Sequence, residues 1–350
     1  MWADIGRIIA NVHPAPRPAA GANAPPVDPE EKVLAALGLR DVGVLSMRAH
    51  CGPQGSYGAL KLDWPGNGQI PRTLRNFFQP GDFPRLRYAP ASARGIDAMR
   101  IDLAGLFDAV VKIIIESGES PAEVTRGLQA VEQFLGFNPR DDLLEQFDGE
   151  FVFVTGEIGE ENAQPGLAEV LSVAVIAGLR DAPQFSTFLE DIIHKRGLHV
   201  TQQTEEFEGV TIYCQDLFMV PIPICYSIVD DMLVVSGSPA MVRQVVHQRN
   251  TPDAPTLIEL PAYREAVASL RPGYGLLGYS DAAADAKSVL RVLRELPKMM
   301  QNEEFDTDVL DWLRDLPLPA DAVVDRYFHG GTATALTVDQ SGIFLESAGP

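Results

Sequence analysis

Two stretches of the chain share one pattern, in which a short apolar strand ends at an acidic residue and leads directly into an amphipathic helix. The first runs from Met99 to Asp102 and continues over residues 103–116, and the second runs from Leu277 to Asp281 and continues over residues 284–296. Because aspartate is a favoured residue at the start of a helix, one such match arises easily by chance. A repeat is therefore indicated only if a second pair of segments also matches at a similar separation.

A second pair of segments does match. The stretch Phe137–Leu144 has a looser echo in Phe305–Leu310, and both pairs lie about the same distance apart. We therefore interpret the chain as copies of one unit of roughly 170 to 180 residues. Asp4–Val12 reads as the helical part of a unit with Asp4 as N-cap, and Gly342–Ser347 reads as a strand close to the last residue. A chain that begins and ends inside a unit is expected to be a fragment or a trimmed protein.

Length supports more than one unit, because 350 residues exceed what one typical hydrophobic core organises. We predict an N-terminal partial unit with a Pro-rich loop at residues 1–94, a first α+β repeat unit at 95–270, and a second, incomplete α+β repeat unit at 271–350. The predicted fold class is α+β, with two related units of mainly antiparallel sheet and amphipathic helices packed on one face.

Apolar residues at alternate positions predict strands, and apolar residues at helical spacing predict helices. Strands are expected at Val42–Ala49, Tyr57–Asp63, Ala98–Ile101, Phe151–Thr155, Leu171–Gly178, Val200–Phe207, Val210–Asp216, Ile224–Val229, Met232–Ser236 and Tyr274–Tyr279. Helices are expected at residues 1–12, Glu30–Leu37, 103–116, Asp141–Phe147, Gln184–Arg196, Ala262–Leu270 and 284–296, and after the N-caps Ser120 and Ser238. Hairpin turns are expected at Glu208–Gly209 and Asp230–Asp231.

Two Pro-rich segments, His13–Pro29 and Pro65–Pro90, are predicted to lack regular structure. Apolar residues in the second, including Phe77, Phe78 and Phe83, are expected to hold it against the core rather than to form a partner surface.

The charge balance restricts the partners that the chain can have. Lysine and arginine number 28 against 48 aspartates and glutamates, which gives a formal net charge of -20. Such a surface repels nucleic acid and anionic lipid head groups, so we predict no nucleic-acid partner. The sequence contains no apolar run of the ~18 residues that a transmembrane helix needs. If Met1 is the true start, the absence of a signal peptide indicates the cytoplasm, and if the chain is a fragment, a periplasmic or extracytoplasmic place stays open.

Cysteine and histidine spacings assign no metal or redox site. Cys214 and Cys225 are expected on neighbouring strands and could pair in an oxidising compartment, but two small buried apolar residues are the favoured interpretation. His194 and His199 are separated by Gly197, which places them at a helix end and a strand start. A structural or solvent role is therefore favoured over metal ligation.

Paired carboxylates are frequent, but their positions favour capping and turn formation over acid–base catalysis. The pairs are Asp141–Asp142, Glu205–Glu206, Asp230–Asp231 and Glu303–Glu304. The acidic run Asp306–Asp311 lacks the glycine and closing glutamate of a calcium-binding loop. Gly273, Gly275 and Gly278 match the letters of a dinucleotide-binding motif, yet a helix is expected before them where the motif needs a strand. We therefore assign no catalytic, cofactor-binding or metal-binding residue.

Several recurring apolar and turn stretches resemble a family of uncharacterised bacterial proteins labelled protein of unknown function 3352. They are Thr256–Tyr263, Leu270–Tyr274 with the strand to Asp281, Asp142–Glu150 and Asp230–Ser238. The resemblance covers roughly residues 95–350. It implies a repeated α+β protein that sits outside the cytoplasmic membrane behind a signal or anchor, and it assigns no catalytic residues.

Three hypotheses about function follow. The favoured one is a non-enzymatic binding or structural module of the bacterial cell envelope, whose partner is a protein or an envelope component. The first alternative is a hydrolase with a site of dispersed Asp, Glu and His residues, which a cleft with converging carboxylates would favour. The second alternative is a small-molecule or lipid carrier, which a single deep apolar cavity would favour.

Overall fold

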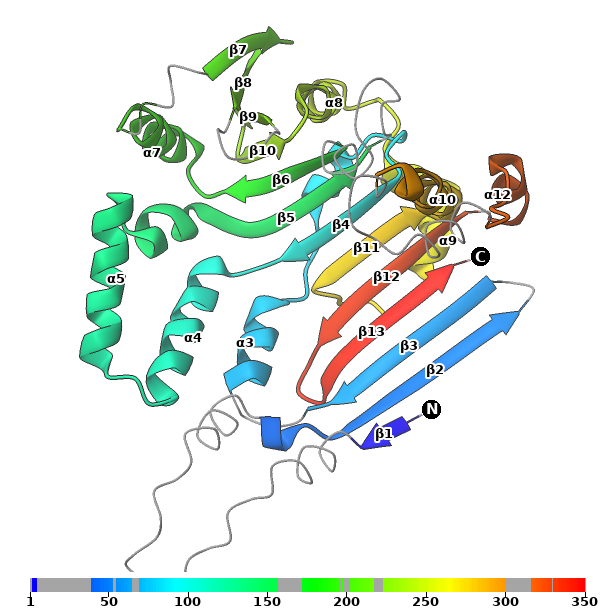
Figure 1. Cartoon of the computed structure of the whole chain (residues 1–350), viewed down its shortest axis with the longest axis horizontal. Helices are drawn as coiled ribbons and strands as arrows, with labels where there is room; N and C mark the ends of the chain where they lie inside the picture. The colour runs from blue at the N-terminus through cyan, green and yellow to red at the C-terminus, as the bar shows by residue number, and fades with distance from the viewer. Residues whose placement is uncertain are drawn as a thin grey trace, which may run out of the picture.

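The structure, a computed structural model, describes residues 2–4, 39–52, 55–64, 69–156, 172–195, 197, 202–216, 223–299, 316–328 and 330–349. All described strands join one antiparallel sheet in the order β1-β2-β3-β13-β12-β11-β4-β5-β6-β10-β9-β8-β7, which runs from lower right to top in Figure 1. The strands are β1 Trp2–Asp4, β2 Val44–Gly52, β3 Gly55–Asp63, β4 Gly95–Arg100, β5 Phe147–Thr155, β6 Val173–Leu179, β7 Gln202–Phe207, β8 Val210–Asp216, β9 Pro223–Val229, β10 Met232–Ser236, β11 Leu276–Asp281, β12 Gly331–Val338 and β13 Gly342–Gly349.

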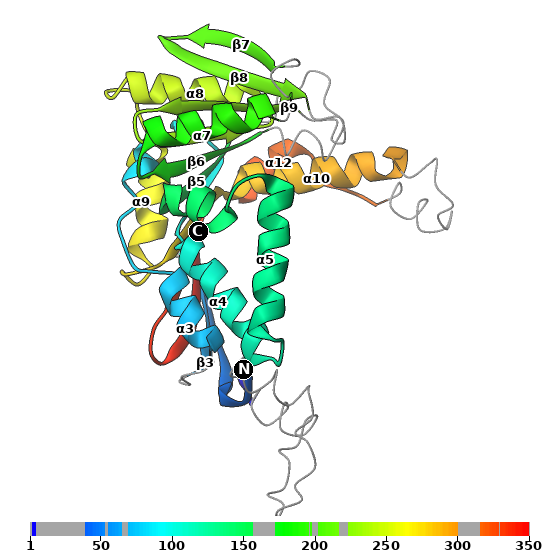
Figure 2. The same cartoon turned by 90° about the vertical axis from the view of Figure 1, so that its left-hand side faces the viewer.

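The helices lie on both sides of this sheet. The α-helices are α3 Gln69–Phe77, α4 Leu103–Glu116, α5 Pro121–Leu135, α7 Ala182–Lys195, α8 Pro239–Asn250, α9 Pro261–Ala268, α10 Ala282–Met299 and α12 Asp321–Tyr327. Short turns of other helix types are η1 Leu39–Asp41, η2 Pro84–Tyr88, η3 Pro139–Leu143, η4 Leu144–Gln146 and η6 Leu257–Glu259. In the side view of Figure 2, α4 and α5 project away from the strands.

The two strand–Asp–helix segments lie side by side at the centre of the sheet. β4 and β11 are antiparallel neighbours, with Ala98 paired to Leu277. Asp102 Oδ1 accepts a 2.9 Å hydrogen bond from Gly105 N at the start of α4. Asp281 Oδ1 accepts a 2.8 Å bond from Ala284 N at the start of α10. Both aspartates therefore cap the helix that follows, as expected of residues that satisfy free helical N–H groups.

The main core lies on one face of the sheet, beneath α8 and α9. Alternate residues of the central strands point into it and are almost fully buried, among them Val152, Ile176 and Val234. α7 packs on the opposite face, where Phe185 contacts a smaller cluster that includes Ile228 and Leu233. Figure 1 shows α7 and α8 on the two sides of β9 and β10. Because successive strand residues face opposite ways, β10 supplies Leu233 to one layer and Val234 to the other.

The α+β class and the mainly antiparallel sheet are confirmed. The sequence predicts the helices on one face of the sheet. α8 and α9 lie on one face, but α7 packs on the opposite face, so this part of the prediction is wrong. The two predicted hairpins also form, because Glu208 and Asp230 adopt positive φ angles of 50° and 51° at the tips between β7 and β8 and between β9 and β10. Acidic side chains of this size tolerate that conformation better than most.

Several local predictions are wrong. The helix expected at Asp141–Phe147 is replaced by the short turns η3 and η4 and the first residue of β5. Asp4 ends strand β1 rather than capping a helix, since Trp2–Asp4 pairs with β2. The segment Pro65–Pro90 contains α3 and η2, and its Phe83 is buried as expected. The helix after Ser120 forms, but that serine makes no side-chain capping bond.

Some predictions fall outside the described residues. They concern the helices at residues 5–12 and Glu30–Leu37, the segment His13–Pro29, His199, the Glu303–Glu304 pair, and the echo and acidic run within Phe305–Asp311. The division into units at residues 1–94, 95–270 and 271–350 stays a prediction.

Candidate functional site

One row of paired residues crosses the sheet and changes character from one end to the other. The row follows directly opposed positions on neighbouring strands, so all its side chains share the face that carries α8 and α9. In order from β9 to β2 it contains Ser227, Val234, Ile176, Val152, Ala98, Leu277, Ala335, Glu346, Ala59 and Arg48. Ser227 is buried and donates its hydroxyl to the Thr211 carbonyl, and the residues from Val234 to Ala335 are apolar and buried. After Ala335, a glutamate and an arginine enter the row.

The β10 end of this face is closed by α8. Met241, Val242, Val245 and Val246 of that helix belong to the same buried cluster as Met232 and Val234. The helix expected after Ser238 is therefore confirmed, and one side of it is buried. Its N-cap Ser238 makes no side-chain capping bond, and its backbone N–H instead donates to Ser236 Oγ at 3.1 Å.

The β2–β3–β13 end of the same face carries polar and charged side chains instead. They form a cleft of about 520 Å³ between these strands and the segment after α9. Three cations line it, Arg48 from β2, Lys61 from β3 and Arg271 from the loop before β11, while Glu346 is the one acidic residue in the lining. We call this the cationic cleft. A net positive cleft in a chain of net charge -20 creates a local field opposite to that of the molecule.

The single acid of the cationic cleft is already neutralised. Glu346 is only 2% exposed. Its Oε1 accepts a hydrogen bond from the Tyr57 hydroxyl and a 2.9 Å bond from Arg271 Nε. The hydrogen bond to Glu346 raises the pKa of the Tyr57 hydroxyl, followed by desolvation, so the phenol stays protonated and keeps donating. The carboxylate is thus satisfied internally, as a buried charge must be.

An aromatic ring connects two of the cations. Arg271 and Lys61 both lie over the ring of Phe344, with their charged groups 4.6 Å and 5.2 Å from the ring centroid. Such cation–π contacts each contribute about 0.5–1 kcal/mol at exposed sites and hold the charged groups in place. Lys61 Nζ also contacts Asp63 Oδ1 at 2.5 Å, which fixes the lysine at the rim.

Arg48 differs from the other two cations. Its side chain is exposed, and among the described residues it forms neither an ion pair nor a hydrogen bond. Arginine presents planar donors that match a carboxylate or phosphate in a bidentate way. The arrangement of one unpaired arginine beside two anchored cations can therefore hold a small anion.

The carboxylate pairs selected from the sequence that the structure describes are engaged in ion pairs and turns. Glu205 accepts from Arg243 at 2.8 and 2.6 Å, and Glu206 accepts from Thr211 at 2.6 Å. Asp142 accepts from the backbone N–H of Asn138 at 2.7 Å. Asp230 and Asp231 form the tip of the β9–β10 hairpin, and each binds an arginine, Arg249 and Arg85 respectively.

The three glycines of the possible dinucleotide-binding motif follow a helix, and His194 lies near a helix end, both as the sequence predicts. α9 precedes the three glycines, Gly273 has a φ of 85° in the loop, and Gly278 lies inside β11. The strand that a dinucleotide-binding motif requires ahead of its first glycine is thus replaced by a helix. His194 lies in the last turn of α7.

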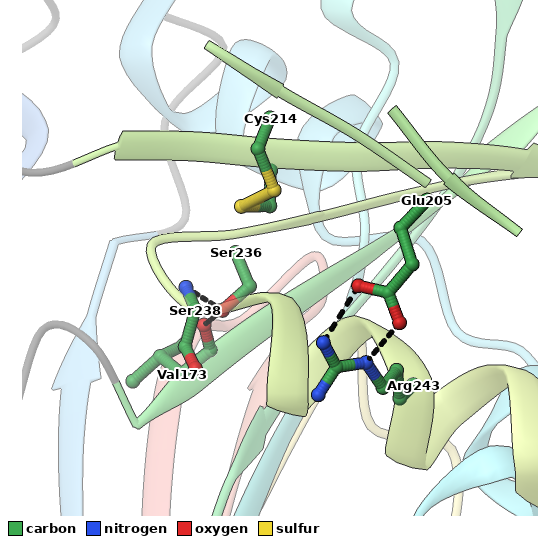
Figure 3. Close-up of a disulfide and its surroundings, with 7 residues drawn as sticks. Val173, Glu205, Cys214, Ser236, Ser238 and Arg243 are labelled. Carbon is green, nitrogen blue, oxygen red and sulfur yellow. Dashed lines mark hydrogen bonds and ion pairs between the residues drawn. A yellow bond between two sulfur atoms is a disulfide. The ribbon is translucent and has the colours of Figure 1, made fainter. Parts of the chain in front are cut away.

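Cys214 and Cys225 form a disulfide, so the interpretation as two separate apolar residues is wrong. The cysteines are directly opposed on β8 and β9, with Cα atoms 4.0 Å apart. Figure 3 shows the bond on the α8 side of these strands, near the Glu205–Arg243 ion pair. The sequence placed both residues on neighbouring strands, but only the register reveals that they face each other.

A smaller cleft at the β4–β11 seam brings two carboxyl groups together. It has a volume of about 260 Å³ and contains Asp97 and Asp285 among hydroxyl-bearing residues. Desolvation, and then the charge of Asp285, raise the pKa of Asp97. In the part of the chain that the structure describes, no group of three or more His, Cys, Asp or Glu residues could hold a metal ion.

The residues of the cationic cleft were not singled out from the sequence. Arg48 and Lys61 lie on one hairpin, but Arg271 and Glu346 are far from them along the chain and join them through the pairing of β13 with β3. One signal was present, since Ser46 and Arg48 put polar residues on one face of the strand predicted at Val42–Ala49.

Comparisons with known proteins add little. No family model matches the chain, and no curated protein matches it. A solved structure entitled "Structure of crystal form I of TP0453" aligns with 77% of this chain and 79% of that chain, at 14% identity and a TM-score of 0.32. This likeness is too distant to carry an argument. No described helix combines the length and apolar character that would let it span a membrane.

Proposed function

We propose that the protein is a non-enzymatic binding module whose cationic cleft holds a small anionic ligand, a carboxylate or phosphate attached to an apolar group. The observation that carries this proposal is the change of character along the cross-strand row, from buried apolar residues to Glu346 and Arg48. An edge that only needed solubility would place its charges toward water without anchoring them. Here Arg271 is fixed by Glu346 and Phe344 around a cleft.

The lining suggests the chemistry of the ligand. Arg48 and Arg271 offer donors for an anionic head, and Leu270, Pro272 and Phe344 offer apolar surface for the group attached to it. A lipid carrier would need a deep apolar cavity, and this charged lining favours a small amphipathic anion instead.

We further propose that the protein works outside the cytoplasm, in the bacterial cell envelope. The Cys214–Cys225 disulfide supports this place, because disulfides persist in oxidising compartments and are rare in the reducing cytosol. The family resemblance implies the same location.

Calorimetric titration with phenyl phosphate tests the ligand proposal, because this probe joins an anion to a planar apolar ring. Arg48→Gln and Arg271→Gln should each weaken binding about ten-fold or more, since a hydrogen bond to a charged group contributes about 1.5–3 kcal/mol. Arg126→Gln is the matched control, because this arginine lies on α5 outside the cleft and is exposed. Binding that survives both cleft substitutions, or falls equally with R126Q, would refute the cleft as the site.

A second candidate, the hydrolase, is favoured by the Asp97–Asp285 pair alone. A carboxyl group whose pKa is raised beside a second carboxyl group, as that of Asp97 is, fits the pattern of acid–base catalysis. If the seam cleft were catalytic, Asp97→Asn would abolish any hydrolytic activity found in a substrate screen while leaving phenyl phosphate binding unchanged. Activity that persists in D97N would remove this candidate.

A further inference from the structure

A second large cleft lies on the opposite face of the sheet, between α7 and the strands β7–β9. It has a volume of about 560 Å³. α7 contributes Glu190 and Ile193, β7 contributes Gln202, and β8 and β9 contribute Tyr213 and Tyr226. We call it the tyrosine cleft. Because it shares no residue with the cationic cleft, its ligand is a separate question.

The two tyrosines form one aromatic surface. They are directly paired across β8 and β9, and their rings stack with centroids 5.1 Å apart at an angle of 17°. Gln202 Nε2 donates a 2.9 Å hydrogen bond to the Tyr226 hydroxyl, which fixes that ring. Burial raises the pKa of Tyr226 to about 12, so the hydroxyl stays neutral and the ring keeps the electron-rich face that attracts cations.

The ionised groups of the tyrosine cleft leave a negative charge available. Arg249 is held by both carboxylate oxygens of Asp230, at 2.8 and 2.5 Å, so this cation and this acid cancel. Among the residues that the structure describes, Glu190 has only a long contact of 3.5 Å, from the Ser186 hydroxyl. Glu190 lines the same cleft as Tyr213 and Tyr226, and its charge contributes, after burial, to raising the pKa of Tyr226.

The disulfide lies directly behind the aromatic pair. Cys214 and Cys225 follow Tyr213 and precede Tyr226 in the two strands, so the S–S bond ties the strands together on the opposite face. Two strands joined in this way hold their tyrosines in one arrangement, and a preorganised site loses less entropy when it binds.

We propose that the tyrosine cleft binds a small organic cation, an alkylated ammonium group that sits against Tyr213 and Tyr226 and is neutralised by Glu190. Electron-rich ring faces together with one unneutralised carboxylate attract a weakly hydrated cation on two counts. The large negative net charge of the chain, -20, raises the local concentration of cations at such a site. The apolar lining by Leu189, Ile193 and Ile228 accommodates the alkyl groups.

Choline and its uncharged isostere 3,3-dimethylbutan-1-ol separate charge recognition from apolar contact. Titration followed by tyrosine fluorescence and NMR should show saturable choline binding, at least ten-fold tighter than binding of the isostere. Glu190→Gln, an exposed helix position, should weaken choline binding about ten-fold, and Tyr213→Leu should do the same. Asp191→Asn removes the same charge one residue along α7, outside the cleft, and should leave choline binding within about two-fold.

Three outcomes would overturn the proposal. They are an absence of saturable choline binding, equal affinity for the neutral isostere, and equal weakening by D191N and E190Q, which would show that only general surface charge attracts the cation. Circular dichroism of each variant establishes folding, and because E190Q changes only an exposed side chain, it keeps the test decisive if Y213L is destabilised. Failure here leaves the anion proposal for the cationic cleft untouched.

Discussion

The two ends of the sheet are built on the same strand framework but use one face in opposite ways. Outward from the β4–β11 seam, three antiparallel neighbours follow on each side, β5, β6 and β10 on one and β12, β13 and β3 on the other. At the β10 end, α8 buries Met232 and Val234. At the β3 end, the same face carries Tyr57 and Lys61 beside a cleft. The strand framework therefore does not decide whether this face becomes core or binding surface.

Each end also contains a buried glutamate bound by an arginine, and the two pairs differ in what surrounds the arginine. In the β10 end, which α8 covers and which we call the closed end, the side chain of Arg85 is 7% exposed. It contacts Glu150, Asp148 and Asp231. In the β3 end, which contains the cationic cleft and which we call the open end, the side chain of Arg271 is 55% exposed and contacts Glu346. We infer that the first pair belongs to the core, whereas the second anchors an arginine whose side chain stays exposed to a ligand.

The largest expected effect is the loss of unfolding free energy when each arginine is replaced by alanine, and it should differ between the two ends. Arg85→Ala leaves Glu150, 1% exposed, without its cation, and breaking a buried pair in this way costs about 3–5 kcal/mol. Arg271→Ala should cost less, about 1.5–3 kcal/mol for one hydrogen bond to a charged group, since Arg271 is itself 55% exposed and Tyr57 still donates to Glu346. Urea unfolding of both variants measures the difference, and equal losses would show that the two pairs play the same part.

The next largest effect is expected from shortening one side chain on β10 and one on β3, which are each the third strand outward from the β4–β11 seam. Met232→Ala should lower the free energy of unfolding by about 2–5 kcal/mol, because this side chain is fully buried under α8. Lys61→Ala should change it by less than about 1 kcal/mol, since Lys61 lies at the rim of an open cleft. Thermal unfolding monitored by circular dichroism would disprove the contrast if K61A were as damaging as M232A.

The disulfide is expected to stabilise the closed end alone. Replacing both Cys214 and Cys225 by serine should cost about 2–4 kcal/mol, because the cross-link restricts the unfolded chain. Cys51→Ser on the open end should be nearly neutral, since Cys51 is exposed and unbonded. Chemical denaturation with and without a reductant measures both. An unchanged midpoint on reduction would mean that the disulfide does not form in solution.

Two tyrosines should titrate abnormally for different reasons, one at each end. Burial raises the pKa of Tyr226 to about 12, whereas an unfolded tyrosine titrates near about 10. The folded state therefore holds this proton more tightly, and the stability it contributes is complete below pH about 10 and is lost as the pH rises toward 12. Ultraviolet difference titration against Tyr226→Phe identifies the group.

The pKa of Tyr57 is raised chiefly by its hydrogen bond to Glu346. Glu346→Gln should therefore lower the pKa of Tyr57 toward its ordinary value and leave Tyr226 unchanged. A shift of both tyrosines in E346Q would show that the two ends are coupled.

Local sequence signals predicted the elements whose partners lie close in the chain. The hairpins at Glu208–Gly209 and Asp230–Asp231 were predictable because alternation and turn residues act within a few positions. The apolar face of α8 was predictable for the same reason. β1 was not, since Trp2–Asp4 becomes a strand only by pairing with residues 44–46.

The candidate sites depended on long-range pairing that no local pattern encodes. β13 is the last strand in the chain, yet it lies beside β3, and this contact alone brings Arg48 and Arg271 to one cleft. Likewise, Cys214 and Cys225 were placed on adjacent strands from the sequence, but their pairing depends on a register that one residue of slippage would destroy.

The central claim is that one face of the sheet is core at the β10 end and ligand-binding surface at the β3 end. A backbone amide NMR titration of the wild-type chain with phenyl phosphate tests it most directly. We predict saturable shifts confined to β2, β3, β13 and the segment Ser269–Pro272. Shifts centred on β6, β9 and β10, or scattered evenly over both ends, would contradict it.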